Sequence, residues 1–219
     1  MLVADGVIKV EGTKVGNAYL HLASDGVLII DTGMPGNAGR ILAALAQQHR
    51  EPGEVRAIVL THWHPDHMGS AAALSRASGA PVAVGALDAP ALAGRRLPAR
   101  GRRTMGALRR LLGVRPLSAD IALVAGDTIG GCEVIAVPGH TAGSIALRRW
   151  DGIVFSGDAL LGDRRGRLRL PEPGLSLDAE QAMVSVRVIL ELAPTLLLPG
   201  HGKPVRDPSA GWPAPRVPA

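Results

Sequence analysis

The stretch from 61 to 69, THWHPDHMG, places three histidines and one aspartate within six consecutive residues. The whole chain of 219 residues has only seven histidines. Residues two apart on an extended strand end point to the same side, so His62 and His64 can bind one metal ion together. The proline that follows redirects the backbone, so Asp66 and His67 can face a neighbouring point. Imidazole and carboxylate groups bind zinc and similar ions, and this spacing predicts a metal site.

Two further histidines and an aspartate lie in glycine-containing loops farther along the chain. Each follows a short apolar run that we expect to be a strand: His140 after 132–137, Asp158 after 153–155 and His201 after 195–198. Loops at strand ends are places where side chains from distant parts of a chain converge on a site. His21 lies in an alternating strand and His49 at a helix end, where a cation is favoured, so we interpret both as structural.

The other apolar patterns predict a mixture of short strands and helices. Further strands are expected at 7–10, 18–22, 27–30, 57–60, 81–84, 121–124 and 145–149, and helices at 38–49, 69–78 and 178–192. The strands come in two clusters with helices after each, which favours sheets with helical cover on the outside, in an α/β or α+β arrangement. No linker interrupts the chain, so we predict a single domain over 1–219 with an irregular, proline-rich tail from about residue 204.

Composition limits the class of protein. Hydrophobic residues make up 47% of the chain and charged residues 20%, as in a globular protein. No apolar run approaches the roughly 20 residues that a membrane helix needs. The N-terminus has neither the basic start nor the apolar core of a secretory signal, and Cys132 is the only cysteine. We therefore expect a cytoplasmic protein with no membrane segment, no intramolecular disulfide and no metal site built from cysteines.

The net charge of +5 comes from arginine, and eight arginines lie between Arg95 and Arg115. The pattern there predicts a helix with Met105, Leu108, Leu111 and Leu112 on one face, opposite Arg102, Arg103, Arg109 and Arg110. We interpret these arginines as a solvated helix face, with an anionic substrate or nucleic acid as the alternative. The chain has only five aromatic residues, which argues against a stacking platform for nucleic acid.

Together these residues resemble the metallo-β-lactamase-fold superfamily, whose hallmark is His-x-His-x-Asp-His followed by a lone His, a lone Asp and a last His. The matching residues, in order, are His62, His64, Asp66, His67, His140, Asp158 and His201. Asp31, in Ile-Asp-Thr-Gly, resembles the family's early aspartate, which has a structural role near the site. The resemblance covers nearly the whole chain. It implies a four-layer αββα sandwich of the α+β class, with two mixed β-sheets face to face, helices outside and the site along one edge.

The resemblance also implies two divalent metal ions, zinc in the first place, with iron or manganese as the other candidates. The implied ligands are His62, His64 and His140 for the first ion, Asp66, His67 and His201 for the second, and Asp158 as the bridge. Two cations about 3.5–4 Å apart lower the pKa of a shared water, which gives a hydroxide nucleophile. Asp66 is the candidate catalytic residue that orients this hydroxide or takes its proton. The implied function is a dinuclear metal-dependent hydrolase acting on a small ester, thioester or lactone.

Within this superfamily, single residues favour some activities over others. Asp158 argues against true β-lactamases, which lack the bridging aspartate, and His64 argues against flavo-diiron proteins. Glyoxalase II-type thioesterases share every implied ligand. Only residues 202–219 follow His201, however, so we do not expect the C-terminal helices with which those enzymes bind glutathione. Acyl-homoserine lactonases have a tyrosine shortly after the bridging aspartate, whereas the only tyrosine here is Tyr19.

Two other activities stay open. One is a mononuclear iron oxygenase of the persulfide dioxygenase kind, whose glycine–arginine pair Gly166-Arg167 resembles. The other is a metal-dependent RNase of the same fold, which only the basic charge supports. The loop 163–170 (DRRGRLRL) and the segment 95–115 are expected to shape the pocket, with Arg167 or Arg169 pairing with a carboxylate or phosphate of the substrate. The expected partner is therefore a small molecule, anionic if these arginines bind it.

Overall fold

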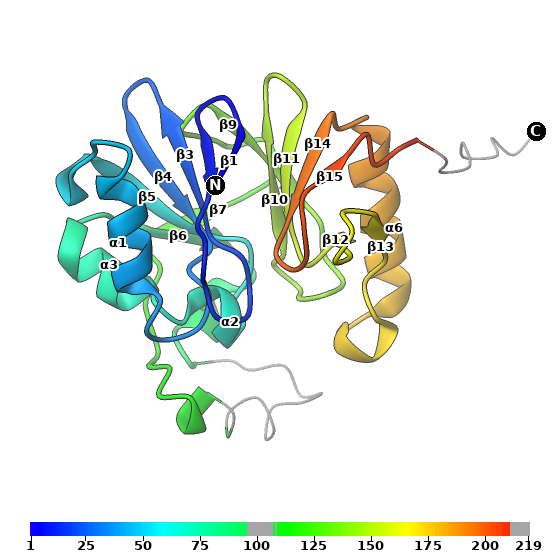
Figure 1. Cartoon of the computed structure of the whole chain (residues 1–219). Coiled ribbons are helices and arrows are strands. Elements are labelled where there is room, and N and C mark those ends of the chain that lie inside the picture. Colours follow the sequence, from blue (N-terminus) through cyan, green and yellow to red (C-terminus); the bar gives the residue numbers. More distant parts are fainter. Residues whose placement is uncertain (96–106, 108, 211–219) are drawn as a thin grey trace, which may run out of the picture.

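The computed structural model describes residues 1–95, 107 and 109–210. Two β-sheets lie face to face in the middle of the fold, and helices cover both outer sides (Figure 1). The first sheet runs in chain order through β1 (Leu2–Ala4), β2 (Val7–Lys9), β3 (Tyr19–Ala23), β4 (Gly26–Ile30), β5 (Val55–Leu60), β6 (Val82–Gly85) and β7 (Ile121–Leu123). The second sheet has the order β15 (Val205–Arg206), β14 (Leu196–Pro199), β11 (Ile153–Gly157), β10 (Ile145–Arg149), β9 (Cys132–Ala136) and β8 (Thr128–Ile129).

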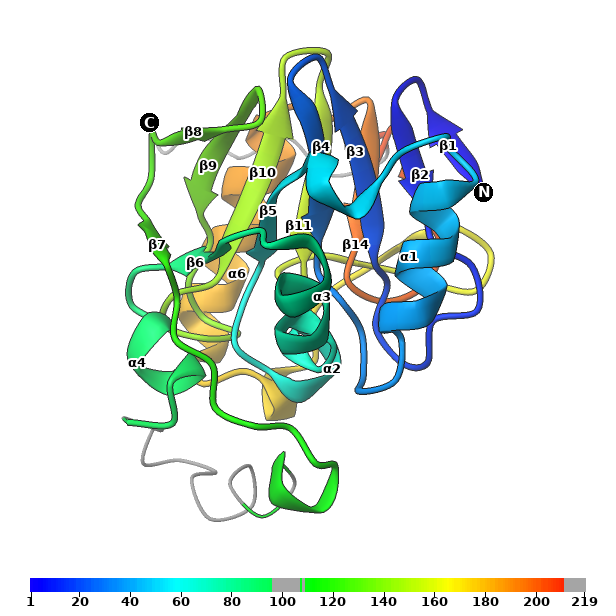
Figure 2. The same cartoon turned by 90° about the vertical axis from the view of Figure 1, so that its left-hand side faces the viewer.

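The main helices pack on the outer faces of these sheets. Helices α1 (Ala38–Ala46) and α3 (Ala71–Ser78) lie in front of the first sheet in Figure 2, and α6 (Ala179–Glu191) covers the second sheet. The shorter elements are α2 (Pro65–Met68), α4 (Ala89–Leu92), the 3-10 turns η1 (Pro52–Glu54) and η2 (Pro173–Leu175), and the small hairpin of β12 (Leu161–Gly162) and β13 (Leu168–Arg169). Among the described helices, none has the length and apolar character needed to cross a membrane.

The four layers follow from strands that are buried on both sides. Every residue of β4 is buried. Ile29 faces the core under α1 and α3, whereas Leu28 and Ile30 face the core between the sheets. A third core joins the second sheet to α6, with Leu197 packed near Ile189. Alternate side chains of one strand thus serve two cores, which is why such strands are continuous apolar runs. The predicted α+β four-layer sandwich is confirmed.

Strand direction explains where the chemistry gathers. Strands β4 to β7 are parallel to one another, and β11 is parallel to β14. The carboxyl ends of parallel strands meet at the same edge of a sheet. Asp31 follows β4, His62 follows β5, Asp158 follows β11 and His201 follows β14. This edge lies at the lower end of the sandwich in Figure 1, where α2 is found.

Two expectations from the sequence were wrong. Residues 205–206 are not irregular, because β15 pairs with β14 in antiparallel register, with Leu196 opposite Arg206. Backbone hydrogen bonding to an edge strand outweighs the proline-rich composition here. Residues 211–219 of the expected tail lie outside the described part of the chain.

The expected faces of the arginine-rich helix were wrong at two of the four positions that can be compared, whereas Arg110 is exposed and Leu112 is partly buried against the first core, as expected. Leu111 is 83% exposed, whereas Arg109 is only 5% exposed. The Arg109 guanidinium donates to the carbonyls of Ala91 (2.8 Å) and Leu92 (3.1 Å) at the end of α4. It also lies 5.9 Å from the centre of the Trp63 ring. These partners bury a charged residue that the local pattern placed in solvent; positions 102, 103, 105 and 108 lie outside the described residues.

Candidate metal centre

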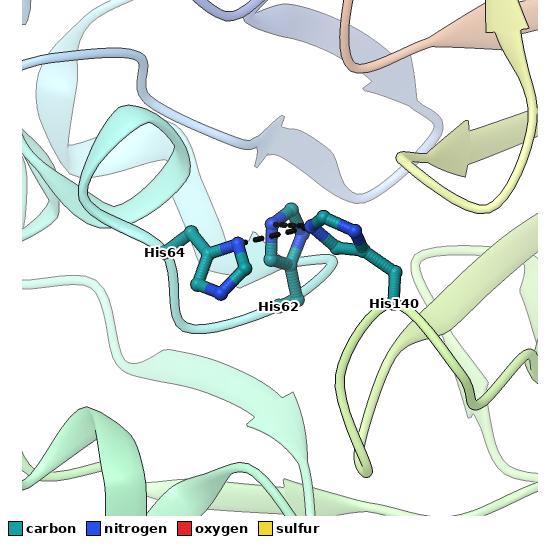
Figure 3. A group of neighbouring side chains, drawn as sticks. All are labelled: His62, His64 and His140. Carbon is teal, nitrogen blue, oxygen red and sulfur yellow. Dashed lines mark hydrogen bonds between the residues drawn. The ribbon is translucent and has the colours of Figure 1, made fainter. Parts of the chain in front are cut away.

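Three histidines converge at the end of β5. His62 and His64 come from the segment between β5 and α2, and His140 comes from the loop after β9. The His140 Nε2 atom lies 3.2 Å from His62 Nε2 and 2.9 Å from His64 Nδ1. Figure 3 shows the three rings turned toward one another. We call these residues the first group; their donor atoms all lie within 4.8 Å of one another.

A second group consists of Asp66, His67 and His201. Asp66 and His67 lie in α2, which begins directly after His64 because Pro65 suits the first position of a helix. The His201 Nε2 atom lies 3.2 Å from Asp66 Oδ2 and 3.4 Å from His67 Nε2. The extended backbone at His64 and the helical turn after it therefore direct the side chains of one short stretch into two groups.

Asp158 lies between the two groups. Its Oδ2 atom is 3.2 Å from His201 Nε2 and 3.6 Å from His140 Nε2, and its Oδ1 atom is 3.4 Å from His67 Nε2. Gly200 leaves the room for this arrangement, because a Cβ there would lie 2.3 Å from Asp158 Oδ1. The structure thus brings together all seven side chains of the sequence motif.

Asp31 contacts His67 at Nδ1, the ring nitrogen that does not face the second group. Its Oδ1 accepts a hydrogen bond from the Thr61 amide (2.8 Å), and its Oδ2 accepts from the Thr61 hydroxyl (2.8 Å) and from His67 Nδ1 (2.8 Å). Because a carboxylate only accepts, His67 carries a proton on Nδ1, and Nε2 is the atom that faces the second group and can bind a metal ion once it has no proton. Asp31 is 2% exposed. Asp31 thus contacts the cluster, and the structural role that the resemblance implied stays a prediction.

Burial and charge set the protonation of the cluster. Burial lowers the pKa of His62 and His140, and lowers the pKa of His64 to about 3, so these rings are neutral at neutral pH. Burial raises the pKa of Asp66, but its hydrogen bond to His201 and the charge of His67 outweigh this effect and lower it to about 2. Burial also lowers the pKa of His67 and His201, but nearby carboxylates outweigh it: the charges of Asp31 and Asp158 raise the pKa of His67 well above its ordinary value, and hydrogen bonds to Asp158 and Asp66 raise that of His201 to about 9. The first group therefore presents neutral nitrogens, whereas His67 and His201 release a proton when a metal ion binds to them.

Two supporting residues were missed by the sequence analysis. The Asn17 side chain donates to the carbonyls of Pro199 (2.8 Å) and Gly202 (2.9 Å), and the Tyr19 hydroxyl donates to Pro199 (2.8 Å). Both side chains are buried and tie the loop of His201 to the first sheet. No local signal could have identified them, since Asn17 and Pro199 are 182 positions apart.

The two arginines proposed for substrate binding have local partners. Arg167 Nε lies 2.8 Å from Asp163 Oδ2, and an Arg169 nitrogen lies 3.3 Å from a Glu172 oxygen. Both arginine side chains are exposed, at 71% and 49%. The described contacts do not connect either one to the seven clustered residues, and a role in substrate binding stays a prediction.

The comparisons with known proteins agree with this geometry. A family model described as the metallo-beta-lactamase superfamily matches residues 12–201, a range that contains all seven clustered side chains. The chain belongs to the metallo-beta-lactamase superfamily. It is 31% identical to a Bacillus subtilis (strain 168) protein named "Probable metallo-hydrolase YflN", over 88% of this chain and 82% of that protein. The family and this relative together identify the chain as a metallo-hydrolase.

The chain is also similar to a curated enzyme and to a solved structure. A hydroxyacylglutathione hydrolase of Cereibacter sphaeroides (strain ATCC 17025 / ATH 2.4.3) is 36% identical over 75% of this chain. The match spans only 54% of that enzyme, about half of its length. The crystal structure of TTHA1623 in a di-iron-bound form is 26% identical, with a TM-score of 0.70, and the alignment covers 96% of this chain and 98% of that one.

Proposed function

We propose that this superfamily member is a dinuclear metal-dependent hydrolase acting on a small ester, thioester or lactone. The observation that carries the proposal is the position of Asp158, whose Oδ2 atom lies within 3.6 Å of a donor nitrogen of each group. The first group would hold one ion, the second group would hold the other, and Asp158 would bridge them. When bound, two such ions supply Lewis acidity and a water of lowered pKa.

The donor set fits divalent cations. Asp158 Oδ1 is buried and has no hydrogen-bond partner among the described residues. The carboxylates of Asp31, Asp66 and Asp158 form ion pairs only with histidines in the described part of the chain. Burying carboxylates costs several kcal/mol each unless positive charge compensates them. Together with the imidazole nitrogens beside them, these oxygens favour zinc first, and the di-iron form of a relative keeps iron as the alternative.

Asp66 is the residue of the cluster best placed to move a proton. Its side chain is 26% exposed, compared with 12% for Asp158 and 3% for Asp31. A carboxylate that contacts both the cluster and solvent can take a proton from a nucleophilic water and pass it to the leaving group or to bulk water. Asp31 and Asp158 are too deeply buried for that exchange. Asp66 is therefore our proposed catalytic residue.

The substrate class follows from the relatives and the ligand set. The hydroxyacylglutathione hydrolase relative is named for cleaving a thioester, which supports thioesters among the proposed substrates. That relative is about twice as long as the matching region, so glutathione itself is not included in the proposal. We also propose a cytoplasmic location, supported by the free, buried thiol of Cys132.

Metal analysis combined with an activity panel tests the proposal. The protein is purified without added metal, its metals are measured by mass spectrometry, and p-nitrophenyl esters, acyl thioesters and lactones are offered as substrates. We expect about two zinc ions per chain and turnover of at least one of these classes. His201→Ala should lose the second metal ion and activity, whereas the exposed His49→Ala should lose neither ion and keep its activity.

Other results would replace the proposal with a different activity. One iron per chain with thiol-dependent oxygen uptake would assign the mononuclear dioxygenase chemistry. RNA cleavage without turnover of any small ester would assign the nuclease. Either outcome leaves the family and the fold as described and overturns the proposed reaction.

A further inference from the structure

A buried carboxylate outside the seven-residue motif joins two parts of the site. Asp88 lies just after β6, at the N-cap of α4, and is 1% exposed. An aspartate at this position commonly accepts a hydrogen bond from the first turn of its helix. Asp88 makes no such bond. Its oxygens are therefore available for partners outside its own helix.

All three described donors to Asp88 come from segments that carry the first group. The Trp63 amide, between His62 and His64, donates to Oδ2 at 3.3 Å. The hydroxyl of Thr141, the residue after His140, donates to the same oxygen at 2.7 Å. The Gly143 amide, in the loop of His140, donates to Oδ1 at 2.8 Å. One carboxylate thus connects the two segments that supply the first group.

Glycines bring the loop of His140 close enough for these bonds. A Cβ at Gly143 would lie 2.3 Å from the Asp88 backbone nitrogen, and a Cβ at Gly85 would lie 2.1 Å from the Gly143 carbonyl oxygen. Both distances are shorter than any ordinary contact, so the two loops pack backbone against backbone. The position of His140 is therefore sensitive to small changes at Asp88.

The chemistry of the contacts requires an acceptor at both oxygens. Two of the donors are backbone amides, which cannot reverse their role. An asparagine side chain would present an NH₂ group to at least one of these amides, whichever way it is turned. A buried N–H left without an acceptor shifts its loop or stays unpaired at a cost. Asp88→Asn is consequently a change of nearly equal size that disrupts the connection.

We propose that Asp88 is a positioning residue for the first metal subsite, holding His140 at the correct distance from His62 and His64. The inference rests on the proposed function, because it presupposes that the first group binds a metal ion. Asp88 does not touch the reacting atoms and acts only through the loops that it joins. Such supporting contacts typically change metal affinity by about 10- to 100-fold.

The test measures metal binding at one subsite at a time. In a His201→Ala background the first group is the only complete one, and adding Asp88→Asn should lower zinc affinity by about 10- to 100-fold in a chelator competition. In a His140→Ala background the first group is already incomplete, and Asp88→Asn should have no effect on the remaining affinity. Cobalt(II) spectra of the same proteins report whether the ligand geometry of the first subsite has changed.

A matched control comes from the other end of β6. Asp120 Oδ2 accepts from the Val82 amide at 2.8 Å, but it has no described contact with the site. Asp120→Asn should leave zinc affinity and the cobalt spectrum unchanged. An Asp88→Asn protein with unchanged first-subsite affinity and spectrum overturns the proposal, even if its melting temperature falls.

A second pair of variants keeps the test decisive if Asp88→Asn does not fold. Thr141→Val removes one donor to Asp88 and should weaken the first subsite, whereas Thr141→Ser keeps the hydroxyl and should restore it. Equal affinities in these two variants would count against the proposal. A wild-type protein that binds no divalent ion would instead overturn the proposed function, a result visible before any variant is made.

Discussion

Replacing Asp31 by asparagine should weaken the second metal subsite through the tautomer of His67. In one orientation, the asparagine keeps its oxygen on the Thr61 amide and turns its NH₂ toward His67 Nδ1. His67 must then accept at Nδ1 and carry its proton on Nε2, the atom that lies 3.4 Å from His201 Nε2. A protonated Nε2 has no lone pair for a metal ion.

The opposite orientation carries its own cost. The NH₂ group would then face the Thr61 amide, which lies 2.8 Å from Asp31 Oδ1 in the wild-type chain. A buried N–H without an acceptor costs about 1–3 kcal/mol. The first orientation therefore excludes the wild-type tautomer of His67, and the second keeps that tautomer only at the cost of an unpaired Thr61 amide. We expect zinc affinity at the second subsite to fall about 10- to 100-fold, equivalent to about 1.4–2.7 kcal/mol.

Zinc titration against a chromophoric chelator measures this loss, and activity should recover in excess zinc. Thr61→Ser is the matched control, because it changes the neighbouring side chain but keeps the hydroxyl that contacts Asp31 Oδ2 and His62 Nδ1, and it leaves the bond to His67 Nδ1 in place. It should bind zinc nearly as well as the wild type. An Asp31→Asn protein with wild-type zinc affinity would refute the reasoning about the tautomer.

Three further outcomes are expected. Asp158→Ala should lower metal occupancy and activity while leaving the circular dichroism spectrum intact; full loading and full activity would refute its bridging role. Burial raises the pKa of the Cys132 thiol to about 11 from 9.0, so Ellman's reagent at pH 8 should react only after denaturation; rapid reaction of the native protein would contradict this. Tyr19→Phe removes the bond to Pro199 and should cost about 1–2 kcal/mol, lowering the melting temperature by roughly 2–8 °C; an unchanged melting temperature would mean that this bond contributes no net stability.

Some features could be predicted because their causes are local. The stretch THWHPDHMG directs its side chains into two groups because they alternate along an extended segment and because a proline then starts a helical turn. Both causes can be recognised from neighbouring residues. The buried strands could be recognised because a strand buried on two sides has an apolar residue at every position. The order of the lone histidines and aspartate completed the match to the superfamily.

Other features depended on contacts between distant segments. Arg109 is buried because carbonyls of α4 and the ring of Trp63 satisfy its charge, and no pattern of periodicity within its own helix contains that information. Residues 205–206 became a strand because β14 presents an edge to them. In both cases a tertiary partner outweighed the local preference.

The sequence by itself determined which seven side chains form the motif and, through the strand pattern, that they lie at or near strand ends. Only the tertiary structure decided what holds them in place. The Thr141 hydroxyl reaches Asp88 across 53 positions, and Asn17 reaches Pro199 across 182. A hydrogen bond depends on distance and direction in space, not on separation along the chain, so an aspartate at a helix start and an asparagine before a strand gave no sign of these roles.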